Sequence, residues 1–133
     1  MRILCTICAR GGSKGIPGKN LKPLNGVPLI HHSITQAIKS KAFNEISISS
    51  DSNEILSIGK ELGVSNLIQR PKTLADDLAG KIPAIRHCLN QVEKKTKTSF
   101  DYIIDLDVTS PLREISDITN VIDQMIKQKW GNV

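Results

Sequence analysis

Four short apolar segments alternate with four segments whose apolar residues recur at helical spacing. The strand-like segments cover residues 3–9, 45–50, 64–69 and 102–106. A strand, a helix and a further strand normally form a right-handed crossover, which makes the two strands parallel. The pattern therefore predicts an α/β fold, a mostly parallel sheet with helices on both faces.

The length of the chain limits how much structure it can hold. It has 133 residues, and its 39% apolar content is enough for the core of one domain. We therefore expect a single domain over residues 1–133. The sequence stops at Val133, where the alternation would place another strand. We expect the domain to be incomplete at this end.

Several residues mark the expected ends of the helices. Pro28 suits a first helical turn, and Asn25-Gly26 suits a chain reversal before it. Asp51 is expected to cap the second helix, with Glu54 three residues later as in a capping box. Ser116 is the expected N-cap of the last helix. The apolar face expected for the third helix consists of Ile82, Ile85, Cys88, Leu89 and Val92.

A glycine-rich, basic segment, Ala9 to Asn20, follows the first strand. Small ligands bind at such strand-to-helix connections in α/β folds. Glycines let the backbone approach a ligand closely, and Arg10, Lys14 and Lys19 supply positive charge. Ser13 stands where a Walker A loop and a dinucleotide-binding loop would each need glycine. The segment therefore indicates a phosphate-binding loop of a third kind.

The positive charge of the chain is concentrated around this segment. Residues 1–44 contain seven Lys or Arg and no acidic residue, whereas the remainder contains 11 basic and 13 acidic residues. Such a field attracts a polyanion, either a nucleoside triphosphate or a nucleic acid. The few aromatic residues are scattered and form no stacking platform. The sequence therefore favours a nucleotide, and we expect no nucleic-acid partner.

Two further classes of function are disfavoured. No window is apolar for long enough to cross a membrane, and Met1-Arg2 leads directly into a strand instead of a signal peptide. We expect a cytoplasmic protein without a membrane partner. Cys5 and Cys8 have the spacing of a redox or metal motif, but residues three apart in a strand point to opposite faces. We interpret them, with Cys88, as small buried residues.

Asp105 and Asp107 stand at the carboxyl end of the last expected strand. Residues two apart in a strand project to the same face, so the two carboxylates could bind a divalent metal ion. An equally acceptable interpretation is that one of them caps a helix or pairs with a neighbouring Arg. The residues by themselves leave both possibilities open.

Four motifs occur in an order that is similar to one known family. They are residues 9–20, Ser49-Ser50-Asp51, the Arg-Pro-x-x-Leu-Ala-x-Asp segment at 70–77, and Thr-Ser-Pro-Leu-Arg at 109–113. Together they resemble the N-terminal part of the cytidylyltransferases that make CMP-activated nonulosonic acids, namely the acylneuraminate cytidylyltransferases and their legionaminate relatives. The resemblance covers essentially the whole chain.

The resemblance implies a Rossmann-like nucleotidyltransferase fold and a defined reaction. CMP would pass from CTP to the anomeric hydroxyl of a nine-carbon acidic sugar, with release of pyrophosphate and with Mg²⁺ as cofactor. The full-length protein would be a homodimer. In the family, a further acidic pair and a dimer-forming segment lie beyond the motifs found here. We therefore expect the 133-residue chain to bind CTP weakly without turnover.

The resemblance also assigns roles to individual residues. Arg10 and Lys19 would contact the triphosphate, and Asn20 and Arg70 would lie near the nucleotide. Asp107 stands where many relatives have a glutamine and would bind the metal ion, with Asp105 as the other possible ligand. Arg113 would pair with the sugar carboxylate or hold its own loop. The remaining residues expected to bind the nucleotide or the sugar are Gly11, Gly12, Ser13, Lys14, Ala79, Lys81 and Thr109.

Lys81 departs from the family pattern, which has a small serine beside the cytosine at this position. Its contact with the base is therefore an open question. Two alternative functions also stay open at this point. One is a cytidylyltransferase for another sugar acid, such as deoxy-octulosonate, or for another base. The other is a nucleotide-binding module without catalytic activity.

Overall fold

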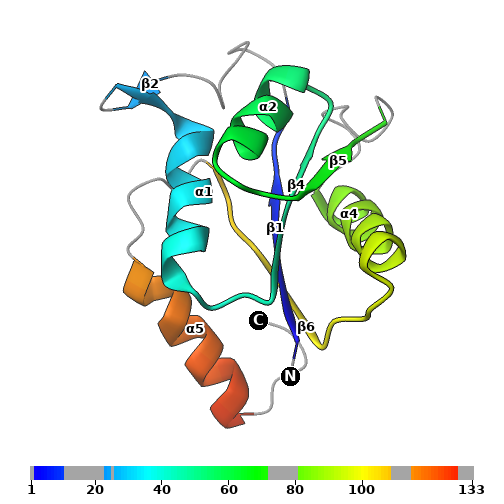
Figure 1. The fold of residues 1–133 in the computed structure, drawn as a ribbon. Helices are drawn as coiled ribbons and strands as arrows, with labels where there is room; N and C mark the ends of the chain where they lie inside the picture. Colours follow the sequence, from blue (N-terminus) through cyan, green and yellow to red (C-terminus); the bar gives the residue numbers. More distant parts are fainter. Residues whose placement is uncertain (1, 11–22, 25, 72–80, 109–114, 129–133) are drawn as a thin grey trace.

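A parallel sheet forms the centre of the structure (Figure 1). The computed structural model describes residues 2–10, 23–24, 26–71, 81–108 and 115–128. The strand order is β5-β4-β1-β6, so the first strand along the chain lies inside the sheet. All three strand pairings are parallel, as predicted. The strands are β1 (Ile3–Cys8), β4 (Glu45–Ser50), β5 (Asn66–Gln69) and β6 (Tyr102–Asp105).

Helices cover both faces of this sheet, which confirms the predicted fold class. Figure 1 shows α1 and α5 together on one side and α4 on the other. The helices are α1 (Leu29–Ser40), α2 (Asn53–Glu61), α4 (Lys81–Thr96) and α5 (Ile115–Gln128). Among the described residues, none of the helices combines the length and the apolar character needed to span a membrane.

The central strand β1 is buried on both faces because helices lie on each side of it. Alternate residues, among them Ile3, Cys5 and Ile7, enter the larger core formed with α1, α2 and α5. Leu4 enters a second core, where it packs with Cys88 and Val92 of α4. This double burial explains why the strand reads as a continuous apolar run.

The α4 face of the sheet becomes polar toward the carboxyl ends of the strands. Thr6, Ser47 and Ser49 are buried there without any exposed surface. The Ser47 hydroxyl donates to the carbonyl of Cys5 at 2.9 Å and lies 3.3 Å from the Cys88 thiol, which donates to it. Hydrogen-bonding side chains therefore replace apolar packing as the sheet approaches this edge.

A short hairpin that the sequence analysis did not predict precedes α1. β2 (Pro23–Leu24) pairs antiparallel with β3 (Val27–Pro28). Gly26 has a φ of 85°, which fits the predicted chain reversal, while Asn25 lies outside the described residues. Pro28 occupies the N-cap position, one residue before the first turn in which it was expected.

Two of the predicted helix caps are wrong. The N-cap of α2 is Ser52, whose hydroxyl accepts a hydrogen bond from the backbone N–H of Ile55 at 3.4 Å. Asp51 therefore lies one position before the cap. Ser116 lies inside α5, which begins at Ile115. The errors are shifts of one and two residues, because the path of the chain from the sheet decides which residue first becomes helical.

The predicted apolar face of α4 also needs correction. Its buried residues are Ala84, Cys88 and Val92, which recur every four positions. Ile82 is 64% exposed because it lies about 200° around the helix axis from Ala84. The helix extends to Thr96, beyond the last residue of this buried face.

Gly59 provides a test of how tightly α2 packs on the sheet. A Cβ atom at this position would overlap with Cδ1 of Ile48 and lie 2.9 Å from Cδ2 of Leu67. We expect Gly59→Val to lower the free energy of unfolding in urea by about 1–3 kcal/mol through overpacking. Ser57→Val, on the exposed side of the same helix, is the control and should change it by less than about 0.5 kcal/mol. Equal effects of the two substitutions would contradict this packing.

Candidate nucleotide-binding site

Two basic side chains lie close together where β1 and β5 end. The backbone N–H of Arg70 donates to the carbonyl of Ser50 at 2.8 Å, which extends the ladder beyond β5. The Arg70 side chain is buried, at 5% exposure, and its Nε and Nη2 atoms have no hydrogen-bond partner within the described part of the chain. Burial lowers the pKa of Arg70 below its ordinary value, the charges of Cys8 and Asp51 oppose this shift, and the positive charge of Arg10 adds to it.

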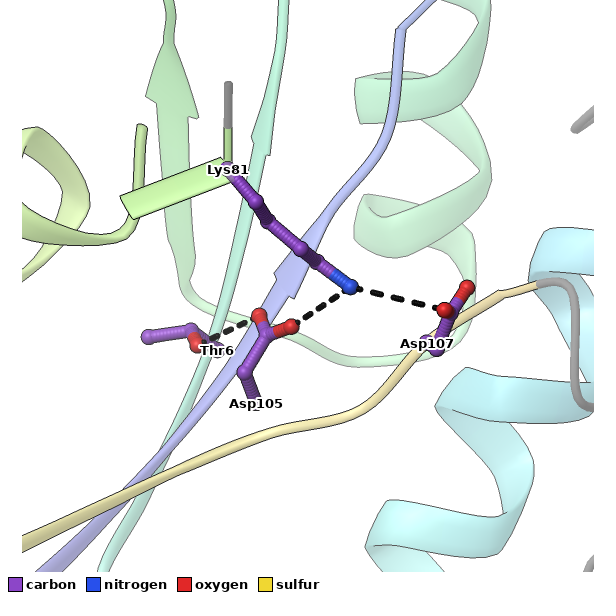
Figure 2. A network of polar contacts seen from close by, with 4 residues as sticks. All are labelled: Thr6, Lys81, Asp105 and Asp107. Carbon is purple, nitrogen blue, oxygen red and sulfur yellow. Dashed lines mark hydrogen bonds and ion pairs between the residues drawn. The ribbon is translucent and has the colours of Figure 1, made fainter. Parts of the chain in front are cut away.

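Two acidic side chains lie at the end of the neighbouring strand β6, and Figure 2 shows how they are held. Asp105 accepts a hydrogen bond from the Thr6 hydroxyl at Oδ1, with 2.8 Å between the oxygens. The ammonium group of Lys81 lies 2.8 Å from Oδ2 of Asp105 and 3.7 Å from Oδ2 of Asp107. One lysine from the start of α4 thus bridges two carboxylates of the sheet edge.

The environment of Lys81 favours its charged form. Burial alone lowers the pKa of Lys81, but the hydrogen bond and charge of Asp105, together with the charge of Asp107, outweigh burial. The net result is a pKa above the ordinary value for lysine. Lys81 is therefore a fixed positive charge between the two carboxylates at neutral pH.

Cys8 lies between the basic and the acidic side chains. Burial raises the pKa of its thiol far above the ordinary range, and the charge of Asp105 raises it further. Arg70 and Lys81 act in the opposite direction on the same thiol. The charges of Arg70, Lys81 and Asp105 therefore all act on the Cys8 thiol at the end of β1.

The cysteines have the structural role that the strand geometry predicted. Cys5 enters the larger core, whereas Cys8 lies on the opposite face, half-buried. Cys88 is buried on the apolar face of α4, and burial raises the pKa of its thiol to about 11. The described part of the chain contains no disulfide bond between these cysteines. The Cys5–Cys8 spacing therefore does not bring two sulfur atoms to one side of the sheet.

The two carboxylates, Asp105 and Asp107, form only part of a metal site. Within the described ranges there is no group of three or more His, Cys, Asp or Glu that could hold a metal ion. Mg²⁺, however, is commonly held by one or two carboxylates together with phosphate oxygens and water. Asp105 and Asp107 fit that requirement in their chemistry, and the Lys81 ammonium already provides a cation between them. The residues present therefore fit a magnesium ion that arrives with a phosphate ligand.

The structure brings together those predicted site residues that it describes. Arg10, Arg70, Lys81, Asp105 and Asp107 all lie at the carboxyl edge of the sheet. The other predicted residues lie outside the described residues: Gly11, Gly12, Ser13, Lys14, Lys19, Asn20, Ala79, Thr109 and Arg113.

Sequence reasoning missed Thr6 and the ion pairs of Lys81. The parallel register places Thr6 directly beside Asp105, although 99 positions separate them in the chain. A polar residue at an inward position of an otherwise apolar strand was the available signal for Thr6. Nothing in the local sequence around Lys81 indicates which carboxylate it meets.

The fold built from these elements is that of the nucleotidyltransferases. The structure of a CMP:2-keto-3-deoxy-manno-octonic acid synthetase complexed with CTP matches 96% of this chain and 48% of its own, with a TM-score of 0.72 and 22% identity. This likeness confirms the predicted Rossmann-like nucleotidyltransferase fold.

The sequence comparison is more specific. The chain belongs to the cytidylyltransferase family, whose model matches residues 4–131. It is 44% identical over 131 residues to the Post-translational flagellin modification protein B of Campylobacter coli, covering 98% of this chain and 56% of that protein. It is 46% identical over 109 residues to the CMP-N,N'-diacetyllegionaminic acid synthase of Campylobacter jejuni. This match covers 82% of this chain and 46% of that protein. The chain thus spans about half the length of these relatives.

The raised pKa values predict that Cys8 and Cys88 are unreactive in the folded protein. Thiols react as thiolates, and a thiol with a pKa of about 11 is ionised to only about 0.1% at pH 8. We expect iodoacetamide to modify both cysteines at least about tenfold more slowly in the folded chain than in urea. Peptide mass spectrometry distinguishes the two sites. Rapid modification of Cys8 without urea would contradict its described environment.

Proposed function

We propose that the protein transfers CMP from CTP to the anomeric hydroxyl of a nonulosonic acid and releases pyrophosphate, with Mg²⁺ as cofactor. Membership of the cytidylyltransferase family supports the nucleotide and the class of reaction. The relative named CMP-N,N'-diacetyllegionaminic acid synthase supports a nonulosonic acid as the acceptor. The described site has the charges that such a reaction requires.

The buried guanidinium of Arg70 is the observation that carries this proposal. Buried N–H donors without acceptors destabilise a protein, so the Nε and Nη2 donors of Arg70 point to a ligand that supplies acceptors. The guanidinium presents planar, parallel donors that match phosphate oxygens or the acceptor edge of a base. Together with the charge of Arg10, Arg70 supplies positive charge that suits the anionic nucleotide. CTP would supply the acceptors that Nε and Nη2 lack.

The carboxylates of Asp105 and Asp107 complete the site for phosphoryl transfer. Asp107 is 54% exposed and is the better placed of the two carboxylates to hold Mg²⁺ together with phosphate oxygens. Bound there, magnesium supplies positive charge that neutralises the phosphoryl oxygens at the reacting centre. Asp105 is only 16% exposed and is already bound to Thr6 and Lys81. Its role is therefore to hold the side chains at this edge of the site in place.

The residues of the chain then have mainly positioning and electrostatic roles. In-line attack of a sugar hydroxyl on the α-phosphorus needs no covalent enzyme intermediate. Arg10 and Lys19 would hold the phosphates that leave as pyrophosphate, and Arg70 would orient the nucleotide. Backbone N–H groups of the glycine-rich segment would add further donors.

The remaining assignments complete the proposal. Asn20 would contact the nucleotide, Ala79 and Lys81 would lie beside the base, and Thr109 and Arg113 would face the acceptor sugar. The cradle for the phosphates would consist of Gly11, Gly12, Ser13 and Lys14. Residues 1–133 would form the nucleotide-binding domain of a cytoplasmic homodimer that needs neither nucleic acid nor a membrane.

Arg70→Met separates a ligand-binding role of Arg70 from a structural one. The substitution keeps the volume of the side chain but removes its charge and donors. We expect the affinity for CTP, measured by isothermal titration calorimetry, to fall about 10- to 100-fold, because hydrogen bonds to charged groups contribute about 1.5–3 kcal/mol. The free energy of unfolding should stay the same or rise, since two buried donors without acceptors are removed.

Arg86→Met is the matched control, because Arg86 is exposed on α4. It should leave CTP binding unchanged. If Arg70→Met destabilised the fold while CTP bound normally, Arg70 would be a structural residue and this part of the proposal would be wrong.

The reaction itself is tested by pyrophosphate release in the presence of Mg²⁺, with a full-length protein that contains residues 1–133, because the 133-residue chain alone is expected to bind CTP without turnover. The acceptor panel contains N,N'-diacetyllegionaminic acid, N-acetylneuraminic acid and deoxy-octulosonate, and the nucleotides are CTP, UTP and ATP. We expect release with CTP and a nonulosonic acid only. Preference for deoxy-octulosonate, or equal use of ATP, would contradict the proposed substrates.

A further inference from the structure

The position of Lys81 is not explained by the helix to which it belongs. Lys81 is the first residue of α4, and the first turn of this helix contains no acidic residue. A positive charge is unfavourable at a helix N-terminus, because the helix dipole already places partial positive charge there. Its stabilisation comes instead from β6, through Asp105 and Asp107 (Figure 2).

The two carboxylates beside Lys81 are not equivalent. Both oxygens of Asp105 are engaged, one by the Thr6 hydroxyl and the other by the ammonium group at 2.8 Å. Asp107 lies at 3.7 Å from the same ammonium and is 54% exposed, against 16% for Asp105. Asp105 therefore anchors the lysine, whereas the exposed side chain of Asp107 can be reached by a second cation.

A divalent cation at Asp107 would lie next to this anchored ammonium. Both cations would then draw on the same pair of negative charges, and they would repel each other across a short distance. Because the lysine is covalently attached, its effective concentration at the pair is high, whereas the metal ion must be recruited from solution. Lys81 therefore lowers the affinity of the acidic pair for any free divalent ion.

We propose that Lys81 is a positioning residue that competes with the divalent cation for Asp107 and so keeps the metal site weak until a phosphate ligand arrives. Triphosphate oxygens supply the additional negative charge that lets the metal ion and the ammonium coexist at this edge. Metal loading is thereby coupled to nucleotide binding. The inference rests on the proposed function, because it takes Asp107 as a metal ligand.

The affinity of the nucleotide-free, 133-residue chain for Mn²⁺ tests this competition. Free Mn²⁺ is measured by electron paramagnetic resonance in titrations of the wild-type chain and its variants. We expect Lys81→Gln to bind Mn²⁺ about three- to tenfold more tightly, because a partly screened positive charge is removed. Lys81→Arg keeps the charge and should stay close to wild type. Asp107→Asn should abolish the gain when it is combined with Lys81→Gln.

Lys94→Gln is the matched control for net charge. Lys94 is exposed near the other end of the same helix, so its loss removes an equal charge away from the site. It should change Mn²⁺ affinity little. The location of the ion is read from Mn²⁺-induced broadening of backbone amide resonances, which should centre on Asp105 to Val108.

The possible outcomes separate the two proposals. If Mn²⁺ binds through Asp107 but Lys81→Gln binds it no more tightly than Lys94→Gln, the competition is disproved and the metal role of Asp107 stands. If Asp107→Asn has no effect on Mn²⁺ binding or broadening in either background, the metal role fails and the competition fails with it. Tighter, Asp107-dependent binding in Lys81→Gln alone supports both.

Discussion

The parallel pairing of β1 with β4 and β6 is the constraint on which the rest of the structure depends. Strands that run in the same direction end at the same edge, and the helices that connect them must cross the faces of the sheet. The register sets Thr6 beside Asp105 and Cys8 beside Ser49. Neither the Thr6 hydrogen bond nor the Lys81 ion pair could form without this alignment.

Charge is divided across that edge in a way that suits the proposed substrates. Arg10 and Arg70 lie on one side, and Asp105 and Asp107 lie on the other. The pKa of the Cys8 thiol is raised by Asp105 and lowered by Arg70. A nucleoside triphosphate needs cations for its phosphates and a metal-binding carboxylate for its reacting centre. The buried, incompletely bonded guanidinium sacrifices stability of the free protein, which is typical of a binding site.

The fold was predictable because it follows from local periodicity. Both ends of β4, Glu45 and Ser50, were predicted correctly, because clear turn signals bound this buried strand. Errors arose where one residue decides the outcome. Ser52 and not Asp51 caps α2, and Ile82 lies outside the core because α4 packs through the face of Ala84, Cys88 and Val92. Such choices depend on how each helix docks against the sheet, and no short pattern contains that information.

The amino-acid sequence was sufficient to establish the alternation of strands and helices and, through it, the positions of Arg10, Asp105 and Asp107 at the ends of strands. Those conclusions depend on periodicity and on the shared direction of parallel strands. Only the tertiary structure decided that the Arg70 guanidinium is buried with unpaired donors, and that Lys81 bridges two carboxylates. The reason is physical: burial and ion pairing depend on strand register and helix docking, which place side chains from distant segments within a few ångströms of each other.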